Sequence, residues 1–275
     1  MDLTSKKTIR DMLQKYAVRP QKKFGQHFLV SRHVLAKILQ AARLKQGGVV
    51  LEVGPGIGTL TQELAKSARR VIAVEKDIKM TDVLRETVSE YKNIELIYGD
   101  ILKLDAGRYT LDPKYKVVAN LPYYMAAPAI RMFLEAKRPP QEMILMVQKE
   151  VGQRICAKPP QMNILAISVQ FYAEPKIVSY VPKGAFWPRP KVDSAIIKIT
   201  RTHTDKKTDS HIFFKIVRAG FSHPRKQLLN NFTGTLKMQR EEIKKWLGSC
   251  DIDPSRRAQT LELNDWACLA KNFPR

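Results

Sequence analysis

The chain has 275 residues, 44% of them hydrophobic, which is enough for one sizeable core plus a smaller appended domain and excludes an intrinsically disordered protein. No apolar run approaches the roughly 20 residues that cross a bilayer, and the polar start lacks the apolar core of a signal peptide, so we expect a soluble, cytoplasmic protein. The three cysteines, Cys156, Cys250 and Cys268, lie far apart in the sequence and lack metal-ligand spacing. We therefore expect reduced thiols, with neither a disulfide framework nor a zinc site.

The net charge is strongly positive. Lys and Arg number 48 against 26 acidic residues, a formal charge of +22, and the pI is near 10.0. Such an excess is typical of a protein whose partner is rich in phosphate. It is densest in residues 1–25, with 7 basic and 2 acidic side chains, and in residues 201–275, with 15 and 8. We expect a basic arm and a C-terminal domain that hold an RNA or DNA backbone, although a solvated surface without a patch would give the same counts.

Short apolar runs alternate with amphipathic stretches from residue 47 onward. The predicted strands are 47–54, 69–77, 93–100, 115–123 and 142–150, and the first predicted helices between them are 59–68 and 78–91. This alternation predicts a doubly wound parallel sheet with helices on both faces. After a helix at 161–172, two strands at 174–182 and 193–200 are joined by a Pro-rich loop too short for a crossover helix. We expect them to form an antiparallel hairpin at the end of the sheet.

Past residue 200 the strand pattern stops. A polar, charged linker occupies residues 201–211, and helical spacing returns in the segments 212–221, 225–236, 240–250 and 261–273. The predicted fold class is therefore α/β, a Rossmann-like sheet followed by a small all-α domain. The predicted organisation is a basic N-terminal arm (1–25), a catalytic domain (26–200) and a helical RNA-binding domain (201–275).

The first predicted strand runs into the glycine-rich turn "LEVGPGIGTLT". Its glycines, which let the backbone approach a ligand closely, are Gly54, Gly56 and Gly58. Glu75, at the end of the second strand, is placed to accept both ribose hydroxyls of a nucleoside. This pattern alone fits a nicotinamide dinucleotide as well as S-adenosylmethionine, but Pro55 removes an N–H that a pyrophosphate would use and favours a ligand without phosphates. Asp100, after the third strand, can accept a hydrogen bond from the amine of an adenine ring. A carboxylate at this position is also a common surface turn residue.

The fourth strand ends in "VVANLPYYMAAP", residues 117–128. Pro122 keeps Leu121 extended, so the Asn120 side-chain oxygen and the Leu121 carbonyl offer two acceptors to one NH2 group at the edge where ligands gather. Tyr123 adds a flat face on which a base can stack. Two acceptors that hold the amine hydrogens in a tetrahedral direction localise the nitrogen lone pair for attack on a methyl sulfonium, with no strong base needed. A plain Pro-Tyr turn would explain the tetrapeptide alone. Together with the glycine turn and Glu75, the arrangement resembles methyltransferases that act on exocyclic amino groups of nucleic-acid bases.

Three further segments narrow this resemblance: "KKFGQHFLV" (22–30), "ILMVQKEVGQR" (144–154) and "GAFWPRPKVDSAI" (184–196). With them, nearly the whole chain resembles the ribosomal RNA small-subunit adenine dimethyltransferase family. The resemblance implies an S-adenosylmethionine-dependent methyltransferase domain and transfer of two methyl groups to N6 of each of two neighbouring adenosines. These adenosines lie in a hairpin loop near the 3′ end of small-subunit RNA, within a partly assembled subunit. We expect the enzyme to act as a monomer, without a metal, in ribosome biogenesis.

The resemblance also assigns site residues position by position. The cofactor contacts fall on His27, Leu29, Gly54, Gly56, Glu75, Asp100 and Asn120. The catalytic target-base pocket falls on Asn120, Leu121, Pro122, Tyr123 and Phe186. Because the adenine is expected to lie between the rings of Tyr123 and Phe186, it must first flip out of its stack. His27 stands where bacterial members often have Asn, so a capping or packing role is an alternative for it. The predicted phosphate contacts are Lys22, Lys23, Arg218, Arg225 and Lys226.

Other functions compete with this interpretation. Resistance methyltransferases that act on large-subunit adenine share the glycine turn and the pocket, but "NLPY" and the segment "SHPRKQLLNNF" favour the small subunit. A non-catalytic RNA-binding assembly or transcription factor would keep the fold without the chemistry, and the intact Asn120-to-Tyr123 pocket argues against it. A nicotinamide oxidoreductase leaves the charge and the two rings unexplained. A cytosine C5 methyltransferase needs a nucleophilic cysteine, and none lies in the strand-end loops.

Overall fold

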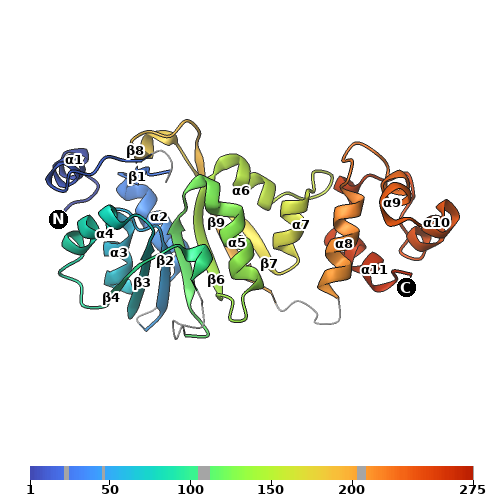
Figure 1. The fold of residues 1–275 in the computed structure, drawn as a ribbon, viewed down its shortest axis with the longest axis horizontal. Coiled ribbons are helices and arrows are strands. Elements are labelled where there is room, and N and C mark those ends of the chain that lie inside the picture. The colour runs from blue at the N-terminus through green and yellow to red at the C-terminus, as the bar shows by residue number, and fades with distance from the viewer. Residues whose placement is uncertain (22–24, 45–46, 105–111, 203–208, 275) are drawn as a thin grey trace. The chain divides into compact units, whose positions relative to one another are not determined.

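The computed structural model describes residues 1–21, 25–44, 47–104, 112–202 and 209–274 (Figure 1). Its contacts divide the chain into two compact units, the first made of residues 1–152 and 175–201 and the second of residues 153–174 and 202–275. In the described part of the chain, no helix has the length and apolar character that crossing a membrane demands.

Within the described residues, a mixed sheet of seven strands forms the first unit (Figure 1). In spatial order the strands are β4 (Ile94–Tyr98), β3 (Arg70–Glu75), β2 (Val49–Val53), β5 (Lys116–Asn120), β6 (Glu142–Gln148), β9 (Ser194–Arg201) and β7 (Ala173–Val181). The strands from β4 to β6 pair in parallel, and β9 runs antiparallel to β6. The predicted doubly wound sheet with a hairpin at its end is confirmed, and β9 lies between β6 and β7.

Helix α2 (Arg32–Ala42) precedes β2. The helices that follow parallel strands are α3 (Thr59–Ser67), α4 (Ile78–Thr87), α5 (Ala126–Glu135) and α6 (Lys149–Ile155). Every residue of β2 is buried, as expected for a central strand covered on both faces. Leu35 of α2 and Leu64 of α3 share a buried cluster with Val50 of β2. Helix α4 begins where the Asp77 carboxylate accepts a hydrogen bond from the Lys79 N–H at 3.1 Å. Strand ends and helix starts therefore gather at the carboxyl edge of the sheet.

The N-terminal residues pack on the first unit. Helix α1 (Lys6–Lys15) buries Ile9 and Leu13 in a cluster with Ile57 and Met80, while its Arg10 is exposed. Within the predicted basic arm at 1–25, α1 therefore packs through an apolar face, which a charge count does not reveal. A short pair, β1 (Phe28–Leu29) and β8 (Phe186–Trp187), then brings the segment after α1 beside the loop before β9.

The second unit is helical, as the sequence predicts. Its helices are α7 (Ile164–Gln170), α8 (Ser210–Gly220), α9 (Leu228–Leu236), α10 (Arg240–Gly248) and α11 (Leu263–Lys271). Its core holds Phe213, Phe232 and Trp266, joined by Ile167 and Phe171 from α7 and the residue after it. The contacts thus assign residues 153–174 to this unit, whereas the predicted boundary at 200 followed the polar linker. An apolar helix face does not reveal in sequence which of two cores it will join.

Two of the three cysteines do not fit the expectation of reduced thiols. Cys250 and Cys268 form a disulfide, and Cys156 is free. The end of α10 packs against α11, where the Trp246 indole N–H donates to the Leu269 carbonyl at 3.1 Å. This packing brings the two Cα atoms within 5.9 Å although 18 positions separate them in sequence. The predicted absence of a disulfide is therefore wrong, because the pairing depends on how the helices pack.

Candidate active site

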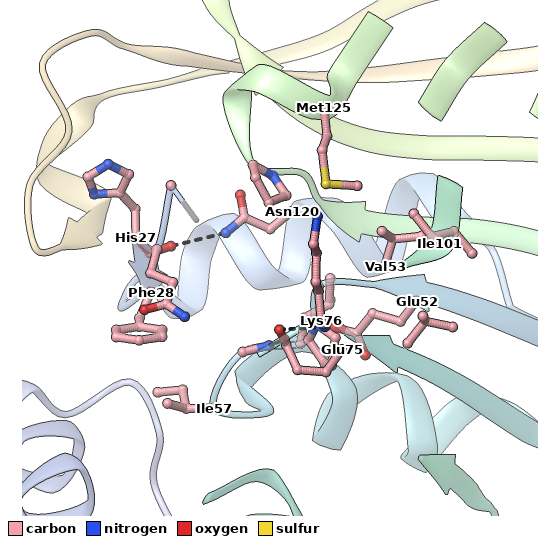
Figure 2. Close-up of a pocket in the computed structure, with 18 of the residues that line it drawn as sticks. His27, Phe28, Glu52, Val53, Ile57, Glu75, Lys76, Ile101, Asn120 and Met125 are labelled. Carbon is pink, nitrogen blue, oxygen red and sulfur yellow. Dashed lines mark hydrogen bonds between the residues drawn. The ribbon is translucent and has the colours of Figure 1, made fainter. Parts of the chain in front are cut away.

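A pocket lies in the first unit at the carboxyl edge of the sheet, where β2, β3, β4 and β5 end (Figure 2). It brings together residues that are up to 100 positions apart in the sequence. The predicted cofactor contacts all line it: His27, Leu29, Gly54, Gly56, Glu75, Asp100 and Asn120. The parallel order of the strands explains this convergence, because the predicted side chains follow neighbouring strands at the same edge.

The glycine turn after β2 forms the floor of the pocket. Gly56 has φ +60° and Gly58 has φ +89°, a region that side-chain-bearing residues rarely adopt. A Cβ on Gly58 would lie 2.9 Å from Leu84 Cδ1, so this position also needs glycine for close packing against α4. The Gly54 N–H donates to the Val74 carbonyl at 2.9 Å, which ties the turn to the end of β3.

Glu75 is fixed by backbone donors. Its Oε2 accepts from the Gly56 N–H at 3.1 Å, and its Oε1 accepts from the N–H groups of Lys76 and Asp77 at 2.9 and 2.8 Å. Burial raises the pKa of Glu75, and the three N–H groups oppose this shift. Oε1 already accepts two hydrogen bonds, but Oε2 accepts one and keeps a second lone pair. Glu75 can therefore accept a further hydrogen bond from a ligand hydroxyl at Oε2 while remaining in place.

Asp100 has a cationic neighbour that the sequence analysis missed. The Lys76 ammonium lies 2.8 Å from Asp100 Oδ2, and the Leu102 N–H donates to Oδ1 at 3.1 Å. These hydrogen bonds hold the pKa of Asp100 below its ordinary value. Lys76 also lines the pocket and is labelled in Figure 2. An amine of a ligand that binds Asp100 must therefore share or displace this ammonium.

Glu52 is a second pocket residue that the sequence analysis missed. It is the last residue but one of β2 and is 1% exposed, and its Oε2 has no hydrogen-bond partner among the described residues. Burial raises the pKa of Glu52 to about 8. A carboxyl group inside the otherwise apolar strand "VVLEV" was the signal that could have identified it. Near neutral pH this group is a neutral acid at the pocket wall (Figure 2).

Asn120, at the end of β5, has a fixed side-chain orientation. Its Nδ2 donates to the His27 carbonyl at 3.2 Å, the bond drawn in Figure 2. Because the amide nitrogen is engaged there, Oδ1 is the atom of this amide that can accept from a ligand. Pro122 also lines the pocket, whereas Leu121 is 2% exposed and does not.

The two predicted stacking rings do not line this pocket. Phe186 is 3% exposed in β8, opposite Leu29 of β1. Tyr123 is half-buried; its ring stacks on His27 with centroids 5.9 Å apart, and its hydroxyl lies 3.0 Å from Ser194 Oγ. His27 itself holds the Pro188 carbonyl through Nδ1 at 2.7 Å, so it has a packing role besides lining the pocket.

None of the predicted phosphate contacts is among the described residues that line the pocket. Lys22 and Lys23 fall outside the described residues. Arg218, on α8, and Arg225 and Lys226, in the loop before α9, are exposed on the second unit. Their exposure is compatible with a phosphate contact but does not test it.

Known proteins resemble this chain over nearly its whole length. The model of the family described as ribosomal RNA adenine dimethylase matches residues 17–273. A ribosomal RNA small subunit methyltransferase A of Dehalococcoides mccartyi strain CBDB1 is 47% identical over 267 residues, covering 96% of this chain and 92% of the relative. The protein of the same name from Alkaliphilus oremlandii is 39% identical over 281 residues and covers 98% of each chain.

Two solved structures share the fold. A dimethyladenosine transferase from Plasmodium falciparum has a TM-score of 0.74 at 28% identity, covering 88% of this chain and 96% of its own. The 23S rRNA methyltransferase ErmE has a TM-score of 0.73 at 25% identity, covering 90% of this chain and 99% of its own.

Proposed function

The chain belongs to the ribosomal RNA adenine dimethylase family, and from this premise we propose that it acts on small-subunit ribosomal RNA. It transfers two methyl groups from S-adenosylmethionine to N6 of each of two adjacent adenosines in a hairpin loop near the 3′ end of that RNA. The relatives that match at 39–47% identity bear the name of small-subunit enzymes. The one observation that carries the chemistry is the convergence of Glu75, Asp100 and Asn120 on one pocket.

The hydrogen-bond acceptors that line the pocket fit S-adenosylmethionine, which supplies an electrophilic methyl group on sulfur. Glu75, held by three N–H groups, accepts the ribose hydroxyls. Asp100 accepts from the adenine amine of the cofactor. Gly54 and Gly56 let the backbone approach the ligand, and Pro55 offers no N–H to a phosphate. His27 and Leu29 line the side of the pocket nearest β8.

The target adenine binds beyond Asn120. Asn120 Oδ1 and the Leu121 carbonyl accept the two N6 hydrogens, which turns the nitrogen lone pair toward the methyl group. Tyr123 and Phe186 hold the ring once they have separated from their present contacts, and Pro122 stiffens the backbone between them. The chain provides no strong base in this step. Positioning and electrostatics supply the rate. The N6 lone pair would bond to the methyl carbon as the S–C bond of the bound sulfonium breaks, and the resulting cationic nitrogen would then lose its proton to water.

The substrate partner is ribosomal RNA, and we propose that it is presented in a partly assembled small subunit to a monomer of the enzyme in the cytoplasm. Arg218, Arg225 and Lys226 of the second unit are the proposed phosphate contacts. Lys22 and Lys23 of the first unit are further candidates. Each substitution to Gln is expected to weaken binding to all RNA sequences alike and to lower the dependence of affinity on salt.

The experiment that tests this function follows labelled methyl from S-adenosylmethionine into small subunits that lack the modification. Large subunits and the Asn120→Ala variant are assayed in parallel. Label at N6 of two adjacent adenosines in the small subunit, lost in the variant, supports the proposal. The high TM-score to ErmE makes the large subunit the second candidate substrate, and label found only there would select it. Cofactor binding without any transfer would instead identify a non-catalytic assembly factor.

A further inference from the structure

An aromatic ring is exposed on the outermost strand of the sheet. Tyr180 lies near the end of β7 and is 49% exposed. The Lys149 ammonium lies over this ring, 5.3 Å from its centroid. Lys149 directly follows β6, so it belongs to the same sheet edge as Asn120, which pairs with Met146. A cation therefore covers a ring that the fold leaves open to solvent.

This pair is linked to the residues proposed to hold the target base. The Lys149 N–H donates to the Asp193 carbonyl at 3.0 Å, and the next residue, Ser194, has its Oγ 3.0 Å from the Tyr123 hydroxyl. The Asp193 carboxylate accepts from the Lys183 N–H at 3.0 Å. Asp193 therefore ties together the starts of α6 and of the loop that leads into β8. Through Asp193 and Ser194, the Lys149–Tyr180 pair is therefore connected to Tyr123, which is proposed to hold the target base.

The sequence segment that contains Tyr180 is basic, although the exposed Glu150 directly follows Lys149. Residues 175–192 contain four basic side chains and no acidic one. The Asp193 carboxylate at the end of this segment already accepts a backbone hydrogen bond. A ring face beside cations binds single-stranded nucleic acid because the base stacks while the cations track the backbone phosphates.

We propose that Tyr180 and Lys149 form a platform for the unpaired nucleotide that flanks the target adenosine, with the base stacked on Tyr180 and its phosphate contacted by Lys149. This inference rests on the proposed function, because it assumes a single-stranded RNA loop at the pocket. The ammonium leaves the ring face when the base arrives. An exposed cation–ring contact is worth only roughly 2- to 5-fold in an equilibrium, whereas one base–ring stack is worth roughly 5- to 100-fold in affinity. Replacing the Lys149 ammonium by a base on the face of the Tyr180 ring therefore favours binding of the RNA.

The test compares Tyr180→Ala, Tyr180→Phe and Val178→Ala in methyl transfer to unmodified small subunits. Val178 is the matched control, since it is exposed two positions earlier on the same strand. Tyr180→Ala is expected to raise KM for the subunit about 10-fold with kcat and cofactor affinity unchanged. Tyr180→Phe retains the ring face and is expected to behave like the parent. Equal KM values for Tyr180→Ala and Val178→Ala, or a Tyr180→Phe variant as weak as Tyr180→Ala, would overturn the platform.

A second measurement separates RNA from a protein partner. Binding of a synthetic hairpin with two adjacent unmodified adenosines in its loop is titrated at several salt concentrations. Tyr180→Ala is expected to weaken this binding by the same factor as in the subunit assay, and Lys149→Gln to lower the slope of log affinity against log salt by about one. An effect of Tyr180→Ala on subunits but not on the hairpin would assign Tyr180 to a ribosomal protein and overturn the proposal. Failure of the parent enzyme to transfer methyl at all would instead overturn the proposed function.

Discussion

The two sides of the active site differ in how their groups are held. On the cofactor side, Glu75 is fixed by three backbone N–H groups and the glycine turn is tied to β3. On the target side, Tyr123 stacks on His27, and Phe186 is buried. We therefore expect the proposed cofactor side to be organised before its ligand binds, and the proposed target side to rearrange when a base enters. A preorganised site suits a small cofactor of constant shape, and an adaptable site suits a flipped base that arrives with its RNA.

The largest effect is expected for the Asn120→Ala variant, because Asn120 is proposed to contact both the cofactor and the target base. Losing Oδ1 removes a group that orients the target amine during reaction, and losing one such preorganised contact lowers kcat by about 100- to 1,000-fold. Single-turnover methyl transfer at saturating cofactor and subunit measures this. Asn120→Asp, which keeps an acceptor oxygen, is the control and is expected to retain more activity than the Ala variant. Equal rates in the two variants would mean that Asn120 acts only by bonding to the His27 carbonyl.

The next largest effect is expected on the cofactor side. Glu75→Gln removes the charge and points an NH2 group at backbone donors, so the dissociation constant for S-adenosylmethionine should rise by about 10- to 100-fold. Calorimetric titration of cofactor into the free enzyme measures it. Glu63→Gln, which breaks a surface ion pair with Lys66, is the matched control and is expected to leave binding unchanged. If Glu75→Gln weakened the affinity for the ribosomal subunit by the same factor as the affinity for the cofactor, the division of the site into two sides would be contradicted.

Sequence reasoning succeeded where strand order decides position. Glu75, Asp100 and Asn120 follow strands whose alternation with helices forces a parallel sheet, and the structure places all three at one pocket. It failed where long-range packing decides. The ion pair of Lys76 with Asp100 and the stacking of His27 on Tyr123 join segments that no local pattern connects. The disulfide and the membership of residues 153–174 in the second unit depend on tertiary packing in the same way. Which residues contact cofactor and RNA stays a prediction.

The buried carboxyl group of Glu52, in the wall of the pocket, is expected to make the free energy of unfolding depend on pH. Its pKa is about 8 in the folded protein against an ordinary value of 4.5, so the unfolded chain ionises first as pH rises. Folding then takes up one proton, and between about pH 4.5 and 8 this group lowers the free energy of unfolding by about 1.4 kcal/mol per pH unit. Below pH 4.5 the group is protonated in both states and has no effect.

Thermal unfolding between pH 5 and 8 measures this contribution as a difference from Glu52→Gln, which has the same shape and does not ionise. The parent is expected to lose about 3–5 °C in Tm per pH unit relative to that variant. Glu90→Gln, at an exposed position of the same unit, is the control and should track the parent. Parallel pH profiles of parent and Glu52→Gln would show that Glu52 is ionised in the folded protein.

The smallest expected effect concerns Lys76, the one cationic side chain among the described residues that line the pocket. Its ammonium occupies Asp100 Oδ2, the carboxylate proposed to accept the adenine amine of the cofactor. Lys76→Met frees that oxygen and removes a positive charge from the pocket proposed to hold a positively charged cofactor, so cofactor affinity should rise by about 2- to 5-fold. Lys79→Met, an exposed lysine on α4, controls for the change in net charge alone. Weaker cofactor binding in Lys76→Met would show that this ammonium holds Asp100 in its binding position, which would make Asp100 as firmly organised by its neighbour as Glu75 is by the backbone.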